Sequence, residues 1–229
     1  MTAELQIISS MTTRELLADL LVSYAQVSMQ PVRATAIGGV DATRRVQAGE
    51  AFDAVVLARG TIEQLIGSKH VVAGSRVDLV HSGVAVAVRA GAKRPDIGSE
   101  AALRQTVLAA RSIGYSTGPS GLHLASLFER WGIADEVRSR IVQAPPGVAV
   151  AALMVRGEVE LGFQQWAELM HHGGIEILGP LPAATQIITT FSAGLAATSV
   201  QAEKVRAMLK FMASPATHEA KRRNGMEPA

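Results

Sequence analysis

The sequence predicts an α/β protein built from two lobes, and three observations support this expectation. Strand-like and helix-like segments alternate at a short period in residues 5–66 and again in residues 100–168, which is typical of βαβ units and a parallel sheet. Two long β-like runs, residues 79–89 and 187–196, interrupt this alternation. Of the 229 residues 48% are hydrophobic and only 4% are aromatic. Aliphatic side chains must therefore fill a sizeable core.

The first stretch of alternation predicts three strand–helix pairs. The strands are expected at residues 5–8, 32–37 and 54–57, and the helices at 13–26, 41–48 and 61–66. The first helix carries Leu16, Leu20 and Tyr24 at helical spacing, which indicates one buried face.

The second stretch of alternation predicts one leading helix and three more strand–helix pairs. Its helices are expected at residues 100–110, 122–131, 148–156 and briefly around Glu168, and its strands at 113–116, 141–143 and 161–164. Two helices, 201–212 and 215–224, close the chain.

The two long β-like runs predict the domain organisation. No helix follows the first run until Ser99, and only two helices follow the second, so we expect each run to carry the chain from one lobe to the other. The first lobe is then residues 1–83 together with 193–229, and the second lobe is residues 84–192. The C-terminal helices are expected to pack on the first lobe.

Charge and composition exclude several classes of function. The net charge is only +2, and basic and acidic residues are interspersed, so we expect no nucleic-acid partner. The densest basic cluster, Lys221-Arg222-Arg223, is interpreted as a helix end facing its own dipole. No apolar run approaches the ~20 residues that span a bilayer, so no membrane insertion is expected.

No metal or cofactor is expected. The chain has no cysteine, which removes disulfides and thiolate ligands. His171-His172 has no acidic partner at metal spacing and is interpreted as an exposed loop. There is no P-loop, and Gly38-Gly39 lacks the full dinucleotide fingerprint.

The strand-to-helix junctions carry the chemistry that the sequence suggests. In open α/β sheets, ligands bind beyond the carboxyl ends of the strands, where helix N-termini favour anions. Four junctions are small, hydroxylated or turn-forming: Ser9-Ser10-Met11, Gly38-Gly39, residues 116–121 and Pro145-Pro146-Gly147. Plain helix capping is the alternative explanation for each. Residues 116–121 are longer than a cap requires, since they hold two serines, a threonine, two glycines and a proline.

Several segments follow one another in a characteristic order: the opening strand-Ser-Ser-helix, VDLVHSGVAVAVRAG, YSTGPSGLHLASLFERWGI, GEVELGFQQWAEL with its later GPLP, and MASPATHEAKRRNGMEPA. In this order they resemble the molybdate-binding-protein family of bacterial ABC-type periplasmic solute-binding proteins. The resemblance covers nearly the whole chain. It implies the type II periplasmic-binding-protein fold, which has two Rossmann-like lobes, two hinge strands and an interlobe ligand site. It also implies a monomer in the periplasm that serves an ABC-transporter membrane subunit. Residues 1–8 show no secretory signal, so a cytoplasmic location or a removed leader stays open.

The residues depart from the family's oxyanion pattern at two positions. Ser10 matches the first serine of molybdate binders, but Gly38-Gly39 stands where they have a second serine, and Gln164 stands where they have a tyrosine. A carboxamide suits a carboxylate or a hydroxyl. Arg59 could pair with a carboxylate, although it could equally be solvated. We therefore expect a small anionic ligand, with an organic acid favoured over a metal oxyanion.

The expected function is binding of this solute with hinge closure. The candidate ligand-binding residues are Ser9, Ser10, Met11, Gly38, Gly39, Arg59, His81, Ser82, Ser116, Ser120, Gly121, Gly147 and Gln164.

An enzyme is the alternative function, because the resembling subgroup includes an aconitate isomerase. Proton transfer on an unsaturated tricarboxylate needs a base, and His81 and His123 are the candidates, with Ser10 and Ser120 as hydrogen-bond donors. Each histidine could instead be an ordinary surface residue. A ligand-sensing domain ranks last, because no helix-turn-helix precedes Leu5.

Overall fold

The computed structural model describes residues 3–229, which form two compact units. The first unit contains the described residues up to Ser82 together with Thr189–Ala229, and the second contains Gly83–Ile188. The chain passes between them within β4 (Val77–Arg89) and at the start of β9 (Ile188–Leu195). These two strands are the hinge strands of the fold.

The first unit is built on a mixed sheet in the order β2-β1-β3-β9. Its strands β1 (Leu5–Ser10), β2 (Val32–Ile37) and β3 (Ala54–Ala58) are parallel, and β9 runs antiparallel to β3. The short strand β10 (Glu227–Pro228) pairs with β4. The parallel strands require helical crossovers, which α1 (Arg14–Val27) and α2 (Gly39–Gln47) supply, and α3 (Arg59–Gly67) follows β3.

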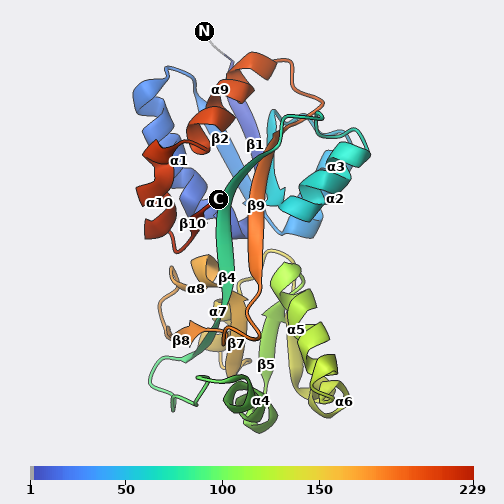
Figure 1. Cartoon of the computed structure of the whole chain (residues 1–229), viewed down its shortest axis with the longest axis vertical. Coiled ribbons are helices and arrows are strands. Elements are labelled where there is room, and N and C mark those ends of the chain that lie inside the picture. The colour runs from blue at the N-terminus through green and yellow to red at the C-terminus, as the bar shows by residue number, and fades with distance from the viewer. Residues whose placement is uncertain (1–2) are drawn as a thin grey trace. The chain divides into compact units, whose positions relative to one another are not determined.

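Helices cover both faces of this sheet (Figure 1). On one side lie α1, α9 (Ala202–Met212) and α10 (His218–Arg223), and on the other lie α2 and α3. Ile8 and Val55 of the sheet pack with Ala42 of α2 and Ile62 of α3. Because side chains alternate along a strand, Ser9 faces the opposite layer, where α1 and α10 lie.

The second unit has its own mixed sheet. Strands β5 (Ile113–Ser116), β6 (Ile141–Ala144) and β7 (Leu161–Gln165) are parallel in the order β6-β5-β7. The second half of β4 pairs antiparallel with β7 and with β8 (Ile175–Pro180).

Residues of β4 alternate between the two cores of the second unit. Val84, Val86 and Val88 pack with α4 (Glu100–Ala109), α5 (Pro119–Arg130) and α6 (Ala134–Val137). Ala85 and Ala87 pack with α7 (Val150–Val155) and α8 (Trp166–Leu169). Both faces of this strand are buried, so it has the continuous apolar run that the sequence shows.

The elements differ from the sequence expectation in several places, and the short helix α6 is one that was not predicted. Helix α5 begins at Pro119 rather than near residue 122, because proline is well suited to the first turn, where its missing N–H costs nothing. The expected helix at 215–224 is a 3₁₀ turn, Pro215–Thr217, followed by α10. Strands β8 and β10 were not predicted, since β8 ends on a proline and β10 has two residues.

Candidate functional site

The carboxyl edge of the first unit's sheet brings together two of the four predicted junctions and the start of α3. Ser10 is in register with Ile37, and Ser9 with Val56, so β1, β2 and β3 end at the same level. Helices α2 and α3 begin at this edge behind Gly38 and Ala58, and neither of these residues makes a side-chain cap. The first N–H groups of both helices therefore lack a side-chain partner at their caps, which favours an anion there.

The Ser10 hydroxyl lies at the start of a 3₁₀ turn, Met11–Thr13. Its Oγ accepts from Thr12 N at 3.3 Å and lies 3.3 Å from Thr12 Oγ1. Both contacts are long, so a ligand could replace them at small cost. Ser9 differs, because its Oγ is enclosed without a hydrogen-bond partner.

Arg59 is already paired with two carboxylates. Its Nε lies 3.0 Å from Glu63 Oε1, and its Nη1 lies 3.5 Å from Asp78 Oδ2. The pKa of Glu63 is lowered, because the hydrogen bond from Arg59 outweighs desolvation, which acts to raise it. The sequence suggested Arg59 as a partner for a carboxylate of the ligand, but its positive charge is already balanced inside the first unit.

His81 is held near the same edge by a neighbouring strand. Its Nδ1 lies 3.0 Å from Thr190 Oγ1, and Thr190 immediately precedes Phe191, which pairs with Ala58 at the end of β3. Ser82 is 1% exposed and belongs to the buried part of β4.

The carboxyl edge of the second unit holds a serine-rich turn. Ser116 is in register with Ala144, and its Oγ accepts from Gly118 N at 3.3 Å and lies 3.4 Å from Ser120 Oγ. A Cβ on Gly121 would lie 1.7 Å from the carbonyl oxygen of Ser116, so only glycine allows this turn. The turn brings two hydroxyls to the N-terminus of α5.

His123 follows this turn in the second helical turn of α5. Its Nε2 lies 2.8 Å from the carbonyl oxygen of Thr185. A carbonyl can only accept, so Nε2 carries the proton, and in the neutral ring Nδ1 holds the lone pair.

Gln164 is a buried residue that holds α7 and α8 in place. Its Oε1 accepts from Val150 N at 2.9 Å, and its Nε2 donates to Glu168. With 1% of its surface exposed, the carboxamide is engaged within the second unit. Gly147 adopts a φ of 77° in the turn before α7. This left-handed conformation favours glycine whether or not a ligand binds there.

A family model for bacterial extracellular solute-binding proteins matches residues 5–227. The chain belongs to this family. A curated relative, the aconitate isomerase of a Pseudomonas species, is 36% identical over 187 residues, which are 80% of this chain and 70% of the relative.

Solved structures of solute-binding proteins share the fold. The periplasmic molybdate-binding protein of Azotobacter vinelandii has a TM-score of 0.81 at 17% identity, covering 97% of this chain and 98% of that one. A tungstate ABC transporter structure from Geobacter sulfurreducens has a TM-score of 0.77 at 13% identity, covering 95% and 97%. The predicted family and the type II periplasmic-binding-protein fold are confirmed.

Two features are absent from the residues that the structure describes. Among residues 3–229, no cluster of three or more histidine, cysteine, aspartate or glutamate side chains could hold a metal. No helix in the same range is both long and apolar enough to cross a bilayer. Solute binding is the coarse function that membership of this family supports.

Sequence reasoning missed Lys221. The sequence interpretation treated Lys221 together with Arg222 and Arg223 as a basic helix end facing its own dipole. Lys221 is only 1% exposed, whereas Arg222 and Arg223 on the same turn are exposed. A signal was present, because Lys221 lies four residues after Thr217 and three before Asn224, and both of these are buried. That spacing marks one inward face of a helix.

Proposed function

We propose that this solute-binding protein binds a small organic acid with several carboxylates, using the carboxyl edges of both sheets. The observation that carries the proposal is the arrangement of donors: each edge presents a serine hydroxyl beside helix N-termini whose caps have no side-chain partner. Hydroxyls and backbone amides bind anions without bringing a competing negative charge.

A polycarboxylate fits better than a tetrahedral metal oxyanion. The second serine and the tyrosine of the molybdate pattern are replaced by Gly38-Gly39 and by Gln164, and the Gln164 carboxamide is occupied by Val150 and Glu168. Two oxyanion donors are therefore missing. The relative at 36% identity acts on aconitate, a tricarboxylate, whereas the molybdate and tungstate binders are 17% identical or less.

The proposed mechanism is hinge closure about β4 and β9. A ligand that gains contacts from both units only when they close shifts the open–closed equilibrium by its difference in affinity. By family membership, we also propose a periplasmic location and a transporter membrane subunit that reads the closed state.

The binding proposal is tested by calorimetry on wild type and three alanine variants. Citrate, tricarballylate and cis- and trans-aconitate are compared with molybdate, tungstate and sulfate. Ser10→Ala and Ser116→Ala should each weaken carboxylate binding by about 1.5–3 kcal/mol, the worth of a hydrogen bond to a charged group. Ser126→Ala is the control, because Ser126 lies on the exposed side of α5 and bonds only Leu122 O. Unchanged affinity in both test variants would exclude these donors.

Isomerisation of the bound acid is a second candidate function. The aconitate isomerase relative favours it, as does the tautomer that Thr185 sets for His123, which leaves Nδ1 able to take a proton. A base would remove a proton from the methylene carbon of aconitate, and the resulting dienolate would accept a proton at the former vinylic carbon. No atom is gained or lost.

Deuterium exchange tests this second candidate without assuming the direction of the reaction. Each aconitate isomer is incubated with the protein in D₂O and followed by proton NMR. Isomerisation should deplete the methylene signal and produce the other isomer, and His123→Gln should slow both changes. Tight binding without exchange would mean that the protein only binds the acid.

A further inference from the structure

Lys221 is the one cation near the carboxyl edge of the first unit whose charge is not balanced by the described residues. Arg59 pairs with Glu63 and Asp78, and the remaining arginines of this region are also paired. Those pairs are Arg14 with Glu15, Arg76 with Glu63 and Asp78, Arg222 with Glu227, and Arg223 with Asp19. Within residues 3–229, the Lys221 ammonium makes no hydrogen bond and no ion pair.

Strand registers place Lys221 at the level of this edge. Ala58, the last residue of β3, pairs with Phe191, and the adjacent Thr190 contacts His81. His81 is in register with Glu227 of β10. The residue before Glu227, Met226, donates its N–H to the carbonyl oxygen of Lys221 at 3.1 Å. Lys221 is therefore close to the level at which β1, β2 and β3 end.

The stem of Lys221 is buried while its ammonium reaches the surface. The residue is 1% exposed in total. Among the described residues, two polar side-chain atoms are fully enclosed and have no hydrogen-bond partner, Ser9 Oγ and Ser28 Oγ. Lys221 Nζ also has no partner but is not in this group, so it is not fully enclosed. The small exposed area thus includes the charged tip. Burial lowers the pKa of Lys221, because desolvation penalises the charged form.

An ammonium that is largely desolvated and unpaired is costly until a counter-ion binds. Long cationic side chains usually extend their heads into water, but here almost the whole side chain is covered. An anion bound at the edge would supply the missing charge.

We propose that the Lys221 ammonium is the cationic contact for the anion that this protein binds. The inference rests on the proposed function, since it names a further residue of the same site. It assigns to Lys221 the part that the sequence suggested for Arg59.

Calorimetry with Lys221→Met tests the inference. Methionine keeps most of the length and volume of the stem and removes the charge. Tricarballylate is the probe, because it has three carboxylates and no double bond to shift. We expect at least a tenfold loss of affinity. The unliganded variant should unfold at the same temperature as wild type or higher, because an unpaired buried charge has gone.

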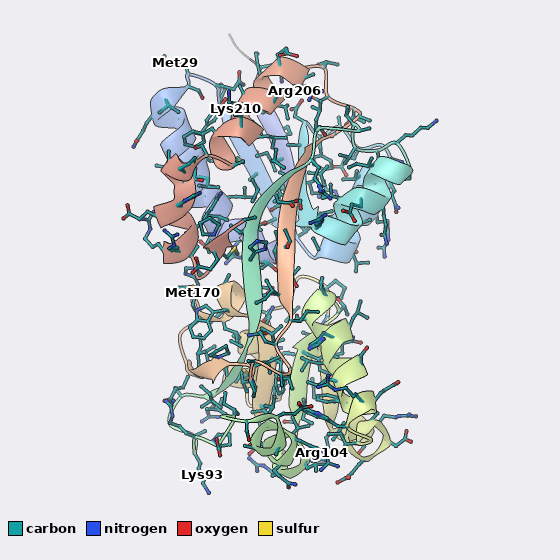
Figure 2. All side chains as sticks on the ribbon, in the orientation of Figure 1. Met29, Lys93, Arg104, Met170, Arg206 and Lys210 are labelled. Carbon is teal, nitrogen blue, oxygen red and sulfur yellow. The ribbon has the colours of Figure 1, made fainter. Side chains whose placement is uncertain are left out.

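Lys210→Met is the matched control. Lys210 lies on α9 of the same unit, is exposed and carries the same charge (Figure 2). The affinity of this variant should stay within twofold of wild type, so general loss of positive charge is separated from loss of a contact. Equal affinities for Lys221→Met, Lys210→Met and wild type would overturn the inference.

The pH dependence of wild-type affinity gives a second measurement, which does not depend on a variant folding. Affinity should fall as pH rises through the pKa of Lys221, because only the ammonium form attracts the anion. The charged or titratable groups on α10, β10 and the elements packed against them include Arg14, Glu15 and Asp19 of α1, His218, Glu219, Arg222 and Arg223 of α10, Glu227 of β10 and His81 of β4. His81→Gln should keep this alkaline decline, and Lys221→Met should remove it. A flat alkaline profile in wild type would count against the inference.

The ligand panel separates failure of the inference from failure of the proposed function. If wild type binds an inorganic oxyanion but no carboxylate, the proposed carboxylate ligand is wrong, and the same variants test Lys221 with that oxyanion. If wild type binds no anion, both proposals are wrong.

Discussion

At the scale of single residues, Gln164 shows how one buried polar side chain can hold two helices beside a candidate site. Its carboxamide receives the N–H of Val150 at the start of α7 and donates to Glu168 in α8. One buried side chain therefore fixes two short helices that follow the edge of the second sheet.

Gln164→Leu should destabilise the protein rather than change its ligand affinity directly. The substitution leaves a backbone N–H and a carboxylate without their partner, at about 1–3 kcal/mol for a buried unsatisfied group. Urea unfolding measures the loss. Gln143→Ala is the control, because Gln143 is exposed on β6 and should stay within about 0.5 kcal/mol of wild type. A strong loss of affinity in a fully folded Gln164→Leu protein would instead assign this residue to the ligand.

At the scale of elements, one carboxylate joins the start of α4 to the end of α5. Glu100 Oε1 accepts from Trp131 Nε1 at 2.6 Å and from Arg130 Nη2 at 2.7 Å. The hydrogen bond from Trp131, followed by that from Arg130, lowers the pKa of Glu100 below its ordinary value of 4.5.

This contact predicts an acid-sensitive contribution to stability. A carboxyl whose pKa is lower in the folded state stabilises the protein fully above its unfolded value, and the contribution is lost as pH falls through the folded value. Glu100→Gln should therefore flatten the pH dependence of the unfolding free energy below about pH 4.5. Urea titrations at several acidic pH values measure this, with the exposed Glu129→Gln on α5 as control. Parallel slopes in wild type and Glu100→Gln would contradict it.

The elements also show how far sequence patterns reach. The alternation of strands and helices, together with the two long apolar strands, predicted the α/β fold, because buried parallel strands and their crossover helices leave strong periodic signals. Strand β10 left no such signal, since a two-residue strand has no period. The sequence placed Ser10 and Ser116 at strand-to-helix junctions, where the structure has them, but could not identify the partners of Arg59 and Gln164. Those partners depend on side-chain contacts, including Asp78, 19 positions from Arg59.

At the scale of the whole molecule, the proposed closure predicts a change in distance between the two units on ligand binding. The chain has no cysteine, so introduced cysteines can be spin-labelled selectively. Gln64 on α3 and Glu129 on α5 are both exposed and lie in different units, so labels at these two positions report the distance between the units. Electron–electron double resonance should show a shifted and narrower distance distribution with ligand. Labels at Gln64 and Glu203, both in the first unit, should show no change, and an unchanged distance between units would exclude closure.

The discontinuity of the first unit has a consequence for biosynthesis. The second unit is one uninterrupted stretch, Gly83–Ile188, whereas the first needs β9, α9 and α10 from the end of the chain. Strand β9 pairs with β3 across more than a hundred intervening residues. The ribosome therefore releases every residue of the second unit before it releases the partner of β3, so the later part of the sequence can fold first. Until β9 emerges, β3 presents an open edge, and this nascent stage is where the chain most needs protection from aggregation.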